Sequence, residues 1–221
     1  MNIVSVEAGR VTQIFVADEV RAERDIYVPQ LIDLVQKRYG FTTLPTLSET
    51  KTGGAKFGHG VLGTEKGSIT IEALEIYNDG IVASCRNTVD ADTVLSDAIA
   101  WGTQAFGLRA PKTFLPRTYG SFVVADFKAS TSALFGRFAE MQELMSAAYE
   151  HRYKVKRNYE TSKLSIAVDP TTVPQFTNTE FLFDRRSGAP YSLNRFFCVA
   201  PLPTPEHIAF LEKFEGLFGT T

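Results

Sequence analysis

The order of apolar and polar residues changes its period several times along the chain, and each change marks a predicted element. The early stretch IVSVEAGRVTQIFVAD alternates apolar and polar residues, which predicts a short strand, a turn at Gly9 and a second strand over 11–17. Residues 26–39 instead space their apolar side chains three and four apart, with Pro29 suited to a first turn and Gly40 to a helix stop. The chain therefore begins with two predicted strands and a helix.

Three alternating stretches follow, KFGHGVLG, SITIEALEIY and IVASCRNT. The last two are separated by Asn78-Asp79-Gly80, a strong hairpin signal because these residue types tolerate the positive φ of tight turns. Helical spacing then returns over residues 90–105. The first half is thus predicted to end in an antiparallel meander followed by a helix.

The same order of elements then repeats. YGSFVVADF predicts a strand over 119–127, and residues 130–151 predict a long helix with an apolar stripe of Leu134, Phe138, Met141, Leu144 and Met145. Two hairpins are predicted next, one from YKVKRNY and LSIAVD and one from NTEFLFD and YSLNRFFCVA. Residues 204–218 predict a final helix with Thr204 as its N-cap.

These patterns predict an α+β fold with internally duplicated β-α-β(3-4)-α units, antiparallel sheets and helices packed on one face. The predicted halves are 1–108 and 119–221, with 109–118 as a connector. The tetrapeptides FVAD at 15–18 and VVAD at 123–126 fit a duplication. Chance recurrence, and a single continuous domain, remain open alternatives.

Composition narrows the classes of function. Hydrophobic residues make up 44% of the chain, charged residues 22%, and the net charge is −2, which is typical of a globular protein and argues against nucleic acid as a partner. No apolar run is long enough to span a membrane, and the first residues lack a signal-peptide pattern. Cys85 and Cys198 lie in strand-like segments without paired spacing, so we expect buried, unpaired thiols in a cytoplasmic protein.

Candidate chemistry is sparse, and we predict no catalytic residue, metal site or cofactor. In KTGGAKFGHG the glycines have the spacing of a phosphate-binding loop, but His59-Gly60 stand where that motif needs Lys-Ser/Thr. His59 stays a candidate ligand-binding residue because neighbouring glycines would let a ligand approach. Asp18 and Asp126 join it, since they would end equivalent strands and could converge. Solvated strand ends are the competing interpretation.

Residues 151–163, HRYKVKRNYETSK, mix cations with tyrosines. Charge and stacking could bind single-stranded nucleic acid there, with Arg152, Lys154, Lys156 and Arg157 as candidates. The favoured interpretation is an edge strand whose outward lysines prevent aggregation.

The aromatic-rich hairpin at 179–200 leads to the functional hypothesis. Period-2 alternation must place some of its rings on the outer sheet face, so Phe181, Phe183 and Phe196 are candidate interface residues. We therefore expect a non-enzymatic protein acting through self-association or partner binding, with a homo-oligomer or a protein partner. The alternatives are a small-molecule-binding protein or enzyme using a cleft between the halves, and a nucleic-acid binder using residues 151–163.

Overall fold

The computed structural model describes residues 1–15, 27–46, 48, 50, 54–107, 116–169, 171–172 and 180–218. Its strands form one eight-stranded sheet in the order β2-β3-β4-β1-β5-β8-β7-β6, and every pairing is antiparallel. The fold is therefore α+β, as predicted. The bounds are β1 (Asn2–Ile14), β2 (Gly54–Thr64), β3 (Gly67–Tyr77), β4 (Gly80–Cys85), β5 (Thr118–Asp126), β6 (Lys163–Ile166), β7 (Phe181–Arg185) and β8 (Arg195–Ala200).

The two predicted halves meet in the middle of this sheet. β1 pairs with β5, and outward from that pair the strands run β4, β3, β2 on one side and β8, β7, β6 on the other. The hairpin at Asn78-Asp79 lies between β3 and β4, as predicted. Of the predicted connector 109–118, residues 109–115 lie outside the described part, and β5 begins at Thr118.

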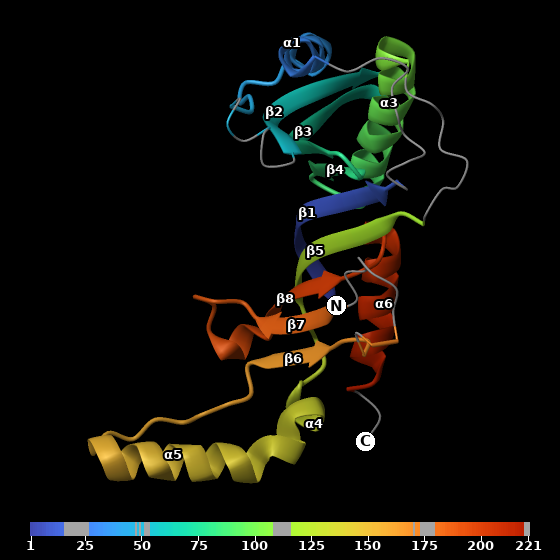
Figure 1. Cartoon of the computed structure of the whole chain (residues 1–221). Helices are drawn as coiled ribbons and strands as arrows, with labels where there is room; N and C mark the ends of the chain where they lie inside the picture. The colour runs from blue at the N-terminus through green and yellow to red at the C-terminus, as the bar shows by residue number, and fades with distance from the viewer. Residues whose placement is uncertain are drawn as a thin grey trace.

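Helices α3 (Thr88–Phe106) and α6 (Thr204–Gly216) lie on the same face of the sheet (Figure 1). Helix α1 (Val28–Tyr39) packs against the outer strands of the first half, and Gly40 ends it in the left-handed conformation. The predicted helix over 130–151 is instead three pieces, α4 (Ser132–Phe135), the 3-10 turn η1 (Gly136–Phe138) and α5 (Ala139–Tyr153). A second 3-10 turn, η2 (Tyr191–Leu193), precedes β8.

Each half has its own hydrophobic core beneath its helices. The first is built around Val11, Phe57, Leu74 and Leu95, and the second around Phe183, Phe196 and Leu211. Cys85 lies in the first core and Cys198 in the second, and both are buried and free, which confirms the prediction for the thiols. Burial raises the pKa of each to about 12, so neither is a ready nucleophile.

The predicted turn at Gly9 is wrong, because β1 continues unbroken through it. Gly9 pairs with Ser121 of β5, and the start of α3 packs directly on it. A Cβ at Gly9 would lie 2.0 Å from the carbonyl carbon of Asn87 and 2.1 Å from the backbone nitrogen of Thr88. Glycine at this position therefore lets α3 lie close against β1, and it does not form a turn.

Beside Gly9, buried hydroxyl groups join the first residues of α3 and α6. The Thr88 hydroxyl and backbone N–H both donate to Thr204 Oγ1 at 3.1 Å, and the Thr204 N–H donates to Thr88 Oγ1 at 2.6 Å. Ser121 also donates to Thr204 Oγ1 at 3.1 Å. Thr204 is thus the first residue of its helix rather than the predicted N-cap, and its side chain links the halves.

His207 faces the sheet from α6 and has no exposed surface. Neither ring nitrogen has a hydrogen-bond partner among the described residues. Burial lowers the pKa of His207 to about 4 from an ordinary value of 6.5. The folded imidazole therefore stays neutral while the unfolded chain takes up a proton as the pH falls below 6.5.

We expect the free energy of unfolding to drop by on the order of 3 kcal/mol as the pH falls from about 7 to 4, since the unfolded state binds the extra proton. Asp126 and Glu215 have lowered pKa values, so their contributions are lost only at the acidic end of this window. Urea unfolding of the wild type and His207→Leu across this range measures the effect. An equal pH slope in both proteins would contradict the assignment to His207.

Candidate functional site: a projecting helical arm

A segment of the second half leaves the sheet altogether. Residues 136–162, which we call the arm, comprise η1, α5 and the return segment 154–162. Helix α5 extends away from the sheet beyond β6, as Figure 1 shows. No residue of the arm is buried, and at 15 residues α5 alone is about 22 Å long. Such a segment contributes little to the folded core.

The arm exposes a stripe of apolar side chains. Phe138, Met141, Leu144 and Met145 follow helical spacing, and Leu144 is 66% and Met141 57% exposed. Ala148 continues the stripe and would allow another backbone to come close. The apolar stripe was predicted on one continuous helix over 130–151, but that helix breaks at Gly136 and the stripe past Phe135 leaves the core. An exposed apolar helix face of this kind is typical of interaction sites.

The return segment runs back along α5 and supports it. Gln142 Nε2 donates to Thr161 Oγ1 at 2.7 Å, and the Tyr159 N–H donates to Ser146 Oγ at 3.0 Å. The rings of Tyr149 and Tyr159 lie 5.8 Å apart. The predicted strand over YKVKRNY is absent, since residues 154–162 contain no strand and β6 pairs with β7 instead.

Charge is separated along the arm. Glu140 and Glu143 lie in the first turns of α5, whereas the candidate nucleic-acid residues Arg152, Lys154, Lys156 and Arg157 lie at its far end. All four cations are exposed, and Lys154 ends the helix in the left-handed conformation. Within the described part of the chain, none of these six groups forms an ion pair. With Arg137 and Glu160 counted at the near end and Glu150 at the far end, the near end keeps a net negative charge and the far end a net positive charge.

The candidate ligand residues do not come together. His59 lies on β2 with a φ of 56°, and β3, β4 and β1 separate it from Asp126 on β5, a distance of about 19 Å across the strands. The neighbouring glycines make room for the chain itself, because a Cβ at Gly60 would meet the Phe41 ring at 2.6 Å. Asp18 lies outside the described residues.

Asp126 is committed to a partner within the sheet. Arg195 on β8 donates to its two oxygens at 2.7 and 2.9 Å. This pairing lowers the pKa of Asp126, chiefly through the hydrogen bonds from Arg195. The carboxylate thus acts as a cross-strand link.

The interface candidates Phe181, Phe183 and Phe196 are core residues, so the argument that they need a partner is wrong. Phe183 and Phe196 have no exposed surface and stack at 3.8 Å between ring centroids. Phe181 packs edge-on against Phe214 of α6, at 5.6 Å. All three share the sheet face that α6 covers, which period-2 alternation alone could not determine.

The opposite sheet face differs between the halves. In the first half Glu75 lies 3.6 Å from Lys56 and 3.8 Å from Arg10, and it accepts a hydrogen bond from Tyr77. In the second half a half-buried apolar band crosses three adjacent strands: Phe122, Leu182, Phe197 and Val199. This face therefore combines internally paired charges with a partly shielded apolar band.

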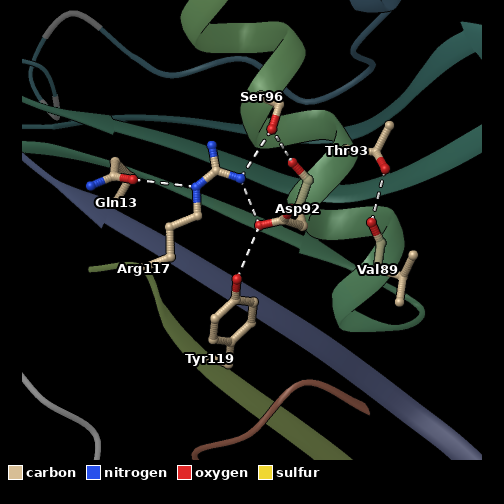
Figure 2. A network of polar contacts seen from close by, with 7 residues as sticks. All are labelled: Gln13, Val89, Asp92, Thr93, Ser96, Arg117 and Tyr119. Carbon is tan, nitrogen blue, oxygen red and sulfur yellow. Dashed lines mark hydrogen bonds and ion pairs between the residues drawn. The ribbon is translucent and has the colours of Figure 1, made fainter. Parts of the chain in front are cut away.

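A polar cluster between the halves is satisfied internally. Figure 2 shows the Arg117 guanidinium between Gln13 on β1 and Asp92 and Ser96 on α3, with Tyr119 also donating to Asp92. The Arg117–Asp92 contact is 2.6 Å. Burial and Asp92 raise the pKa of Tyr119. The cluster joins α3 to both central strands, so its groups are engaged in the fold.

Each half contains a pocket. An apolar pocket of about 310 Å³ lies between α1, α3 and the sheet, with Tyr39 and Trp101 in its wall. A polar pocket of about 570 Å³ lies where the arm joins the body, with Arg185 and Asn194 in its wall. Neither His59 nor Asp126 lines either pocket. Sequence patterns carried no signal for the polar pocket.

No three His, Cys, Asp or Glu side chains in the described part of the chain are grouped so that they could hold a metal ion. None of the described helices is both long and apolar enough to cross a membrane.

Comparison with known proteins adds one likeness. No protein-family model and no curated protein matches the sequence. Among solved structures, Methanococcus jannaschii TBP is similar at 12% sequence identity and a TM-score of 0.44, over 96% of this chain and 95% of that one. This neighbour contradicts the expectation that nucleic acid is an unlikely partner, and we withdraw that expectation.

Proposed function

We propose that the protein acts by association rather than by catalysis, and that its partner is a second copy of the same chain bound through the arm. The observation that supports this most is the arm's apolar stripe, since Met141, Leu144 and Met145 are each about half exposed or more and no arm residue is buried. A second helix laid along the stripe would remove these side chains from water.

Charge separation supports an antiparallel pair. In that arrangement the acidic end of one α5, with Glu140 and Glu143, lies beside the basic end of the other, with Arg152 and Lys154. A parallel pair would place ends of like net charge side by side. Antiparallel contact is also isologous, so it closes as a dimer.

A duplicated origin for the two halves is part of the same proposal. The mirrored strand order about β1 and β5 supports it, as does the reciprocal bonding of Thr88 and Thr204 at the starts of α3 and α6. The arm then interrupts this correspondence, because its equivalent position in the first half is the short helix α1 on the core.

Charge reversal tests the antiparallel pair. Glu140→Lys with Glu143→Lys, or Arg152→Glu with Lys154→Glu, places like charges opposite each other and is expected to weaken association about tenfold or more. All four changes together restore complementarity, so this chain is expected to associate within about threefold of wild type. Sedimentation velocity measures the dissociation constant of each variant's self-association, and circular dichroism controls for loss of α5. A quadruple variant that associates as weakly as the two double variants would contradict antiparallel pairing.

Nucleic-acid binding through the basic end is the second candidate. Its support is the four cations that form no ion pair with any described residue, together with the exposed rings of Tyr153 and Tyr159. Fluorescence anisotropy with a labelled single-stranded DNA, run on the same charge variants, separates the two candidates. Salt-dependent binding that only the Arg152→Glu, Lys154→Glu chain loses would favour nucleic acid.

A further inference from the structure

The polar pocket at the base of the arm contains a guanidinium whose donors are underused. Arg185, at the end of β7, is 11% exposed at its side chain. Its Nη1 donates to the Tyr191 carbonyl at 3.3 Å and its Nη2 to Thr131 Oγ1 at 3.4 Å, both long contacts. Its Nε is buried and has no hydrogen-bond partner among the described residues. The guanidinium therefore has N–H donors that no acceptor among the described residues satisfies.

Among the described residues this group forms an ion pair with Glu160 of the arm, but the contact is loose, since the carboxylate is half exposed and lies 3.9 Å from Nη2. The guanidinium is instead held between the rings of Tyr191 and Phe196, at 4.3 and 5.1 Å from their centroids. These rings fix its plane but satisfy no N–H donor.

The rest of the pocket suits an anion. Lys128 lies in the wall with an exposed side chain, so the ionised side chains of the lining are two cations and Glu160. Asn194 holds the loop beside it, since its Nδ2 donates to the Phe127 and Ala129 carbonyls at 2.9 and 2.7 Å. The ionised side chains of the pocket wall therefore carry a net positive charge.

We propose that this pocket binds an oxyanion, a phosphate or carboxylate group, through Arg185 with Lys128 as a second cation. Planar guanidinium donors match both groups, and binding would give Arg185 the short charge-assisted hydrogen bonds it lacks. Gln142 and Glu160 of the arm share the wall with Arg185 of the body. A bound anion would therefore contact both sides of the joint and steady the arm.

Differential scanning calorimetry of the full chain with inorganic phosphate or with acetate tests the site, using chloride at equal ionic strength as reference. We expect one of the two anions to raise Tm by about 5 °C or more at saturation. Lys128→Met changes an exposed residue, so the variant should fold. We expect it to bind that anion about tenfold more weakly than the wild type does. Arg185→Lys should weaken binding of the anion further.

Lys163→Gln removes an exposed cation outside the pocket wall and is the matched control, expected to bind as wild type does. If phosphate alone raises Tm, the ligand is a phosphate group. If acetate alone raises Tm, the ligand is a carboxylate group. No shift beyond chloride with either anion would overturn the proposal. An equal shift in wild type and Lys128→Met, with Arg185→Lys unchanged or unfolded, would also overturn it.

Discussion

Replacing Gly9 with alanine is expected to destabilise the protein by about 3 kcal/mol or more, the upper range for overpacking a core. The added Cβ would lie 2.0 Å from Asn87 and 2.1 Å from Thr88, and both contacts are with backbone atoms. Backbone atoms at the start of a helix cannot turn away as a flexible side chain can. Relief therefore requires α3 to move off β1, which also strains the Thr88–Thr204 hydrogen bonds between the halves.

Thermal unfolding measures this effect against a matched glycine. Gly63 also lies in a strand, β2, and a Cβ there would meet nothing within 4 Å, so Gly63→Ala should leave Tm nearly unchanged. For a chain of this length we expect Gly9→Ala to lower Tm by about 10 °C. Equal melting temperatures for the two variants would show that α3 does not pack on Gly9.

Leu144→Gln combined with Met145→Gln is expected to weaken self-association about a hundredfold. In a symmetric pair each copy contributes both side chains, so the double variant removes four apolar side chains from the interface. Even partial burial of these four side chains would contribute about 3 kcal/mol to the free energy of association. This energy corresponds to a hundredfold change in the dissociation constant. The folded body should be unaffected, because both residues are already about half or more exposed in the single chain.

Val89→Gln is the control for this substitution. Val89 is also an exposed apolar residue on a helix, α3, at 54% exposure, but it lies outside the arm. We expect this variant to associate as wild type does. Equal weakening by both substitutions would indicate a general effect of surface polarity rather than a site on the arm.

Local patterns predicted much of this fold. Alternation around Asn78-Asp79-Gly80 predicted the hairpin of β3 and β4, and helical spacing predicted α1, α3 and α6 to within two or three residues. These elements carry their own signals, because a turn residue or a stop residue acts over a few positions. The antiparallel sheet followed from the same signals.

Long-range packing was beyond such patterns. The alternation of Phe181 and Phe183 shows that they share a face but not which face α6 covers. Likewise Gly9 resembles a turn residue until α3 is seen against it. The apolar stripe predicted one continuous helix over 130–151, and the one local sign of the break, Gly136, sits inside an otherwise regular helical pattern. No local pattern marks Arg185 as a residue of the polar pocket.

The mass of the full chain in solution tests the central claim most directly. Sedimentation equilibrium over a range of protein concentrations should give a mass that rises from 24.5 kDa toward twice that value for the wild type. The Leu144→Gln, Met145→Gln chain should stay at 24.5 kDa over most of the same range. A wild type that remains at 24.5 kDa at every concentration would contradict association through the arm.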